Sequence, residues 1–339
     1  MSTVKLTTPV GVSALDEPIA LADQIVSVGS CFAQHMSSRL IENCFRVVAN
    51  PYGILYNPAS VSRCLRRVLD GSVFEPGGVF HHADLWQSFE FHGEFADPSR
   101  EGAVGRMNTA HQHAAQALGT CDWLFVTFGT AFAWFHRGQP ELAVANCHRL
   151  PAEQFERRLI PSGEIVADWG DLLDSLFAAR PGMQVMMSVS PIRHLRQQAE
   201  ENSVSKAHLL IAADELASSY PRVHRFPAYE LVMDELRDYR FFERDLVHPN
   251  ELAQEVIWER FRDACLAPEA AEFVAQLAGV RQALDHRPRN AAGDAHWQFL
   301  EHTRGRLEQL VARFPAADLA SVRERLAGMA RGGGEPRTP

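Results

Sequence analysis

Residues Ile25 to Ala33 place a short strand pattern directly against the start of a helix. The strand part is apolar and rich in β-branched residues, and it ends in Gly-Ser. Immediately afterwards Phe32, Met36 and Leu40 recur four residues apart, which is the spacing of one helix face. The segment therefore predicts a strand, a sharp turn and a helix. Ser30 would lie at the carboxyl end of the strand and the amino end of the helix.

Two interpretations of Ser30 follow from that position. The first N–H groups of a helix have no partners within the helix, and the helix dipole favours negative charge beside them. A serine hydroxyl at such a turn can therefore act as a nucleophile with an oxyanion site next to it. Serine is also a common N-cap, which requires no chemistry. The stretch alone leaves both interpretations open.

Strand patterns and helical patterns alternate along most of the chain. Gly53, Gly129 and the segment Pro191 to His194 follow predicted strands, as Ser30 does. This order predicts an α/β fold with an open parallel sheet and a ligand crevice at the carboxyl ends of its strands. The expected strands are residues 24–29, 45–49, 122–128, 183–190 and 223–226, and the expected helices are 31–42, 59–70, 109–118, 168–180 and 205–218.

Composition narrows the classes of partner. The 339 residues carry a formal net charge of −9, so the surface has no basic excess with which to neutralise the phosphates of nucleic acid. The amino-terminal residues lack the pattern of a secretory signal, and no apolar run is long enough to span a membrane. Six cysteines are spread without CxxC pairs, which favours reduced thiols. We therefore expect a cytoplasmic protein that binds neither nucleic acid nor membranes.

Asp245 and His248 form a second candidate element, immediately before the last helix of the predicted sheet domain. Pro249 biases His248 away from helical geometry, so the two residues are expected in a turn. There the carboxylate can hold one ring nitrogen of His248, which leaves the other free to take a proton from a serine hydroxyl. A histidine that only caps or packs is the alternative. With Ser30 at the opposite end of the domain, the pattern predicts a Ser-His-Asp triad.

The chain resembles a known family at these residues. Gly29-Ser30-Cys31-Phe32-Ala33 is the motif that names the GSCFA domain family, which is similar to a divergent branch of the SGNH/GDSL hydrolase superfamily. The resemblance covers roughly residues 23–262. Further family-like stretches are residues 50–58, 88–92, 129–130, 146–148, 188–194, 205–207, 226–230 and 234–248.

The resemblance implies a flavodoxin-like, three-layer α/β/α fold around a central parallel sheet. It also implies that Ser30 is the nucleophile, His248 the base and Asp245 its orienting partner. In the superfamily a glycine N–H after the second strand and an asparagine side chain after the third complete the oxyanion hole. Gly53 matches the glycine by position, whereas the asparagine is missing, since Thr130 follows Gly129. The residues that remain as substitutes are Thr130, Asn57 and Asn146.

Other side chains have competing interpretations. Cys31 adjoins Ser30 and is either a second potential nucleophile or a buried thiol, and we expect the buried thiol. Arg193 is suited to a substrate carboxylate or phosphate, or else to a surface ion pair. His92 and His194 each lie in a family-like stretch and are expected to line the site. The histidine spacings match no standard ligand set, so no metal site is predicted: His81, His82, His92, His148 and His194.

The carboxyl-terminal quarter has a different character. Apolar residues recur at helical spacing over residues 273–284, 300–314 and 319–329, which predicts amphipathic helices. They either pack on the core or form a homo-oligomer. The expected organisation is a sheet domain over residues 1–265, a helical appendage over 266–330 and a disordered tail over 331–339.

The predicted function is acyl chemistry on a small-molecule or glycan ester, without a cofactor. An acyl-enzyme resolved by water gives ester hydrolysis, and one resolved by a hydroxyl gives O-acyl transfer. Residues 74–95 and 131–150 can form a lid over the site. The competing hypothesis is a non-catalytic binding or scaffold protein on the same fold, which the missing asparagine favours.

Overall fold

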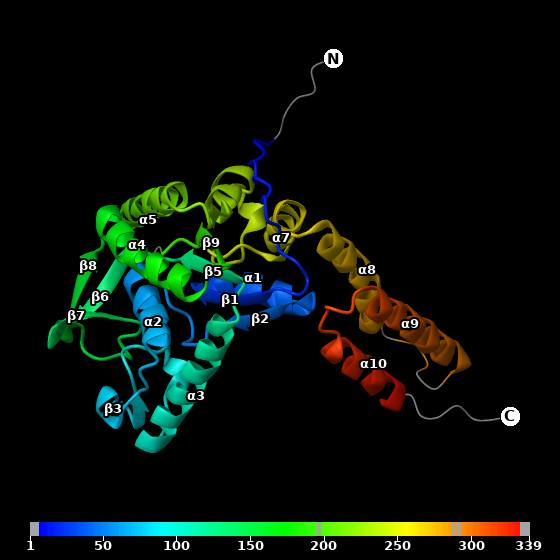
Figure 1. Cartoon of the computed structure of the whole chain (residues 1–339), viewed down its shortest axis with the longest axis horizontal. Coiled ribbons are helices and arrows are strands. Elements are labelled where there is room, and N and C mark those ends of the chain that lie inside the picture. The colour runs from blue at the N-terminus through cyan, green and yellow to red at the C-terminus, as the bar shows by residue number, and fades with distance from the viewer. Residues whose placement is uncertain (1–6, 195–197, 287, 289, 291–292, 333–339) are drawn as a thin grey trace, which may run out of the picture. The chain divides into compact units, whose positions relative to one another are not determined.

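The structure is a computed structural model, and it describes residues 7–194, 198–286, 288, 290 and 293–332. The chain divides into two compact units (Figure 1). The first contains the residues up to 13 together with 24–38 and 47–261, and the second contains 14–23, 39–46 and the residues from 262 onward. The unit of the carboxyl-terminal helices thus includes residues 14–23 and 39–46. The sequence analysis, which expected a sheet domain over residues 1–265, assigned both segments to that domain. Most of the tail predicted to be disordered, residues 333–339, lies outside the described residues.

A five-stranded parallel sheet forms the centre of the first unit. In space its strands follow the order β10-β9-β5-β1-β2, which is the flavodoxin-like order 2-1-3-4-5 when the strands are counted along the chain. The predicted α/β class, with its parallel sheet, is therefore confirmed. The strands are β1 (Gln24–Gly29), β2 (Arg46–Ala49), β5 (Trp123–Phe128), β9 (Gln184–Val189) and β10 (Val223–Arg225).

Helices cover both faces of this sheet. Alternate residues of β1, β5 and β9, among them Val28, Val126 and Met187, share a buried core with the helices α2 to α5. On the opposite face the Phe125 ring lies 5.9 Å from the Phe261 ring of α7. All six residues of β5 are buried, as expected for a strand covered on both faces. The helices of this unit are α1 (Cys31–Glu42), α2 (Pro58–Asp70), α3 (Arg100–Gly119), α4 (Ser162–Ala179), α5 (Ala199–Ser219), α6 (Ala228–Glu230) and α7 (Glu251–Cys265).

Three helices start earlier than the sequence pattern predicts, and one of them, α4, begins at Ser162 rather than at residue 168. The α3 helix begins nine residues before the expected Thr109, because the Ser99 hydroxyl accepts the N–H of Gly102 at 3.0 Å and caps the helix there. The α5 helix begins at Ala199 rather than Ser205. Its first turn is polar, so hydrophobic spacing carried no signal for it.

The segments expected to form a lid contain their own small sheets. A hairpin with its turn around Gly138 joins β6 to β7, and a third strand, β8, which the sequence analysis missed, completes an antiparallel sheet with the order β7-β6-β8. Residues 74–95, the other segment expected to form the lid, contain a second hairpin, formed by β3 and β4. These elements are β3 (Phe80–His82), β4 (Leu85–Gln87), β6 (Phe132–His136), β7 (Gln139–Val144) and β8 (Phe155–Leu159).

The second unit contains the three predicted carboxyl-terminal helices, α8 (Pro268–Asp285), α9 (Asp294–Arg313) and α10 (Ala320–Gly332). Their apolar stripes are buried, and the rings of Phe273 and Phe314 lie 5.3 Å apart. Ion pairs join the helix surfaces, such as Arg313 to Glu272 at 2.6 Å. Among the described residues of the chain, no helix is both long enough and apolar enough to cross a membrane.

Candidate active site

The turn between β1 and α1 is as sharp as the sequence predicts. Gly29 has a φ of +135°, and a Cβ there would collide with the carbonyl of Thr127 on β5. Only glycine fits this position without strain. The Ser30 N–H then donates to the Thr127 carbonyl at 3.1 Å, and α1 begins at Cys31. Ser30 and Cys31 therefore lie between the ends of the two strands where the sheet order reverses, which is where ligands bind in such folds.

The Ser30 hydroxyl is enclosed. The residue is 1% exposed, and its Cβ lies 3.3 Å from the place that a Cβ on Gly129 would occupy. Its Oγ has no hydrogen-bond partner among the described residues, so it contacts neither His248 nor the first N–H groups of the helix. The side chain is thus not an N-cap, and the predicted serine–histidine hydrogen bond is absent. A buried hydroxyl without a partner costs about 1–3 kcal/mol.

Cys31 is the more accessible of the two neighbours. The sequence analysis expected a buried thiol, whereas the structure leaves Cys31 partly exposed. Burial raises the pKa of the thiol, while the N–H groups of Cys31 and Phe32 and the charge of Lys206 act in the opposite direction. The thiol therefore lies at the amino end of α1, beside N–H groups that the helix itself does not use.

Asp245 and His248 adopt the predicted turn. His248 Nδ1 lies 2.6 Å from Asp245 Oδ2, and Asp245 Oδ1 accepts the N–H groups of Val247 and His248 at 2.9 and 3.0 Å. These bonds, that of the His248 N–H first, lower the pKa of Asp245 to about 2. The ionised carboxylate can only accept, so Nδ1 carries the proton and Nε2 is left to take one. Both side chains are about half exposed.

Lys206 is a site residue to which the sequence analysis gave no role. It is 1% exposed, and its Nζ donates to the carbonyls of Gly129 and Ser190 at 2.6 and 2.7 Å. It therefore links the ends of β5 and β9. Burial lowers its pKa to about 7, and Cys31 acts in the opposite direction.

His194 connects the loop of Asp245 and His248 with the strand ends. Its ring lies 5.7 Å from the ring of Tyr56, and its N–H donates to Asn202 Oδ1 at 3.0 Å. Burial lowers the pKa of His194 to about 4, and the charges of Lys206 and His248 act in the same direction. His248 and Lys206 are therefore both within electrostatic reach of His194, which is neutral at pH 7.

The predicted oxyanion donors are engaged elsewhere. The N–H of Gly53 donates to Asn50 at 2.7 Å, and the N–H groups of Gly129 and Thr130 donate to Tyr56 at 2.8 and 3.0 Å. The Thr130 hydroxyl lies 3.1 Å from Ser205 Oγ. The Asn57 side chain caps α2 through Ser60. These residues shape the crevice edge in this structure rather than offering free donors.

The other three predicted residues have different surroundings. Asn146 Oδ1 accepts the N–H of His148 at 2.7 Å. His92 lies 3.4 Å from Glu94 and lines a pocket of about 560 Å³ together with Gly53. Arg193 does not form the surface ion pair considered from the sequence: its Nη2 donates to the Leu246 carbonyl at 2.7 Å, inside the loop of Asp245 and His248.

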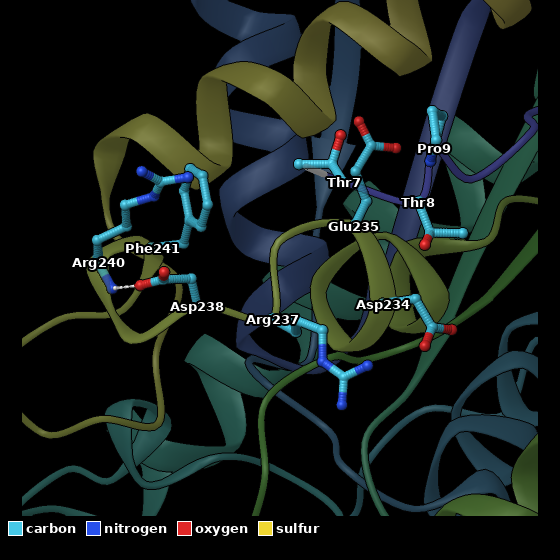
Figure 2. A pocket seen from close by; sticks show the side chains of 9 residues that line it. All are labelled: Thr7, Thr8, Pro9, Asp234, Glu235, Arg237, Asp238, Arg240 and Phe241. Atoms are coloured by element: carbon cyan, nitrogen blue, oxygen red, sulfur yellow. Dashed lines mark hydrogen bonds between the residues drawn. The ribbon is translucent and has the colours of Figure 1, made fainter. Parts of the chain in front are cut away.

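A second pocket, of about 420 Å³, lies beside the segment that precedes this loop (Figure 2). Its charged side chains come mostly from residues 234–240, and none of the predicted site residues lines it. Glu235 is held there by the Val10 N–H at 2.9 Å and by Arg260. No group of three or more potential metal ligands occurs within the described part of the chain.

Comparisons with known proteins identify the family. No curated protein matches the chain. A solved structure described as "a putative platelet activating factor from Streptococcus pneumonia" is 11% identical and covers 71% of this chain and 83% of its own, but its TM-score of 0.36 carries no conclusion. The GSCFA family matches residues 24–261, and the C-terminal domain of GSCFA domain proteins matches residues 277–328. With most of its length matched in this way, the chain belongs to the GSCFA family.

Proposed function

We propose that the protein is an enzyme of acyl chemistry, an ester hydrolase or an O-acyltransferase, with its nucleophile in the β1–α1 turn and His248 as the base. The observation that carries the proposal is the 2.6 Å hydrogen bond between Asp245 and His248. This bond fixes the ring tautomer and leaves Nε2 free to accept a proton. A histidine that only caps or packs has no need of a carboxylate held by two further N–H groups.

The proposed reaction has two steps. In the first, a nucleophile of the turn attacks the acyl carbonyl carbon, His248 Nε2 takes the proton, and the leaving group departs with a proton from the imidazolium. In the second, His248 removes a proton from water or from an acceptor hydroxyl, which attacks the acyl-enzyme and releases the product. Asp245 remains ionised and stabilises the imidazolium that forms transiently.

The amino end of α1 suits the developing oxyanion. The first intrahelical hydrogen bond of this region runs from Gln34 to the Ser30 carbonyl, so the N–H groups of Cys31, Phe32 and Ala33 precede it. These N–H groups and the helix dipole stabilise negative charge. They take the place of the asparagine of the superfamily pattern, whereas the Gly53 N–H is engaged by the Asn50 carbonyl.

The substrate class that we propose is a small-molecule or glycan ester. Gln34 lies one helical turn beyond Cys31 and lines the pocket of about 560 Å³ that also contains Asn50, His92 and Glu94. Amide, imidazole and carboxylate groups of this kind can hydrogen-bond to the hydroxyls of a sugar. Water as the second reactant gives hydrolysis, and a bound sugar hydroxyl gives transfer.

A scaffold function is the second candidate. The enclosed Ser30 hydroxyl favours it, because a serine nucleophile would have to move before it could attack. This candidate predicts that His248 contributes nothing to any reaction of the protein.

The test is the turnover of p-nitrophenyl esters of increasing acyl length by the wild-type protein, His248→Ala and His302→Ala. His302 is an exposed histidine of α9 and serves as the matched control. We expect His248→Ala to lose about 10²- to 10⁴-fold in rate while His302→Ala retains the wild-type rate. Equal rates for all three proteins, or no turnover by the wild type, would contradict the enzymatic proposal and favour the scaffold.

A further inference from the structure

The β1–α1 turn contains two potential nucleophiles in succession, and their side chains have opposite surroundings. Ser30 is 1% exposed and lies against Gly129 and the end of β5. Cys31 is partly exposed. Cys31 is therefore the more accessible of the two residues.

The backbone donors favour Cys31 as well. An oxyanion that forms at a helix start is held by the backbone N–H of the attacking residue or of the residue after it. The Ser30 N–H already donates to the Thr127 carbonyl at 3.1 Å. The Cys31 N–H is the first of α1 and has no partner inside the helix. The attacking residue's own N–H is thus engaged with the sheet at Ser30, whereas at Cys31 it lies outside the helix ladder, beside the thiol.

The position and type of Lys206 also favour Cys31 as the attacking residue. Lys206 is within electrostatic reach of Cys31, and two of its three protons are donated to the carbonyls of Gly129 and Ser190. The chain has 33 lysine and arginine residues, of which only Lys5 and Lys206 are lysines. Lysine, unlike arginine, can lose its proton near neutral pH when it is buried. Lys206 is thus a buried cation that can give up its proton, so a proton can pass between it and a thiol.

The Ser30 hydroxyl supplies an independent indication of a ligand. Its Oγ is buried next to Cys31 and has no partner among the described residues. Buried hydroxyls are normally paired, so an unpaired one beside a candidate site is accounted for by a ligand or a water that binds there.

We infer that the attacking atom of this site is the Sγ of Cys31, so that the acyl-enzyme is a thioester and the acyl donor is itself a thioester. This inference rests on the proposed function and names its nucleophile and its class of donor.

The acyl group would pass from the donor sulfur to Cys31 and then to an oxygen acceptor. The sulfur of Cys31 attacks the carbonyl carbon of R–CO–S–R′ after its proton has passed to His248, the bond to the donor sulfur breaks, and R′–SH leaves with the proton from His248. This exchange replaces one carbon–sulfur bond by another. A hydroxyl or water then attacks the Cys31 thioester and gives its proton to His248 Nε2. The bond between the acyl carbon and the Cys31 sulfur breaks, the sulfur takes the proton from His248, and the more stable oxygen ester or acid is released. A thioester donor makes both steps accessible, whereas an oxygen-ester donor would have to form a less stable bond first.

The resting thiol is protonated, since burial raises the pKa of Cys31. Attack therefore needs a base, and the site provides one in the pair of Asp245 and His248. This requirement separates the inferred site from a cysteine that reacts with any electrophile as a free thiolate.

The experiment maps the acyl adduct. The full chain is incubated with phenyl thioacetate or p-nitrophenyl acetate, quenched in acid, and analysed by intact-mass and peptide mass spectrometry. The variants are Cys31→Ala, Cys31→Ser, Ser30→Ala and Cys147→Ala. Cys147 is the matched control, because it is the other partly exposed cysteine and its pKa is raised to about 11.

We expect one acetyl group on Cys31 in the wild type, in Ser30→Ala and in Cys147→Ala, formed faster from the thioester. Neutral hydroxylamine should release it, as it does thioesters. Cys31→Ala should form no adduct, and Cys31→Ser should form a hydroxylamine-resistant ester slowly at position 31. Circular dichroism of each variant establishes that it is folded.

Two other outcomes have different consequences. An adduct on Ser30 that persists in Cys31→Ala would overturn the inference and leave the proposed function standing. No adduct on the wild type from either probe, together with no turnover of esters, would overturn both. Labelling of Cys147 as fast as of Cys31 would show an unselective thiol and would also overturn the inference.

Discussion

The two halves of the candidate site are held in different ways. At the strand ends, Ser30 and Lys206 are each 1% exposed, and their neighbours are backbone groups of β5 and β9. In the loop, Asp245 and His248 are about half exposed and are held by hydrogen bonds within four residues. The strand-end half is thus part of the core, whereas the side chains of the loop half are held locally and Arg193 is the residue that ties the loop to the end of β9. Substitutions in the first should change stability and chemistry together, and substitutions in the second should change chemistry alone.

The largest effect is expected for His248→Ala. Removal of the general base should slow acylation by about 10²- to 10⁴-fold. The side chain is 44% exposed, so the melting temperature should stay within the error of the wild type. Stopped-flow measurement of p-nitrophenol release gives the acylation rate, and a thermal melt gives the melting temperature. A large loss of stability would show that the loop is not the local element described above.

Asp245→Asn should have the next largest effect, about 10²-fold on acylation, because the amide no longer selects the productive tautomer. Asp245 has a pKa of about 2, so it is ionised throughout the usual assay range. The pH–rate profile of the wild type should therefore show no inflection from Asp245 above about pH 4. An acidic limb there that disappears in Asp245→Asn would contradict this assignment.

Lys206→Met tests the strand-end half. The variant leaves two buried carbonyls without their donor, which should cost about 1–3 kcal/mol of unfolding free energy. The pKa of Lys206 falls from 10.5 to about 7 on folding, so the unfolded chain binds more protons between these values. Wild-type stability should therefore rise with pH from about 7 to 10.5, and this rise should be absent in Lys206→Met. Urea unfolding at several pH values measures both, and a parallel pH dependence in the two proteins would be the contrary result.

Arg193→Ala should weaken the connection between the halves. Arg193 reaches from the end of β9 to the Leu246 carbonyl, and losing one such bond costs about 1 kcal/mol. We expect a loss of about fivefold in kcat/KM. Arg237→Ala, whose side chain lines the pocket of Figure 2, is the control and should match the wild type. If Arg193→Ala and Arg237→Ala change kcat/KM equally, Arg193 does not position the loop.

Ser30→Ala should have the smallest effect. It removes a buried hydroxyl that has no partner, so the variant should be as stable as the wild type or up to about 1 kcal/mol more stable. A loss of several kcal/mol in a urea titration would mean that the hydroxyl makes a structural bond.

The sequence predicted the elements better than the exposure of individual side chains. The β1–α1 turn, the parallel sheet and the turn of Asp245 and His248 follow from local patterns that the structure confirms. The enclosure of Ser30 depends on Gly129, which approaches it from a distant part of the chain. No spacing rule carries that information.

Lys206 shows the same limit. From the sequence, Lys206 is only one more residue of the α5 helix. The two carbonyls that accept its hydrogen bonds belong to the ends of β5 and β9, far away in the sequence, so the local pattern does not indicate its role. The available signals were the family-like stretch 205–207 and the rarity of lysine in a chain rich in arginine. The donors Gly53, Thr130 and Asn57 were predicted by residue type, but the structure engages them in backbone and capping bonds.

A double-mutant cycle between Cys31 and His248 tests most directly whether the two halves act as one site. Hydrolysis of phenyl thioacetate, which leaves a residual rate to measure even where no adduct forms, is followed for the wild type, Cys31→Ala, His248→Ala and the double variant. If the halves cooperate, His248→Ala slows the wild type by about 10²- to 10⁴-fold and has almost no further effect in Cys31→Ala. The same factor in both backgrounds would show that His248 acts independently of the turn and would contradict the account.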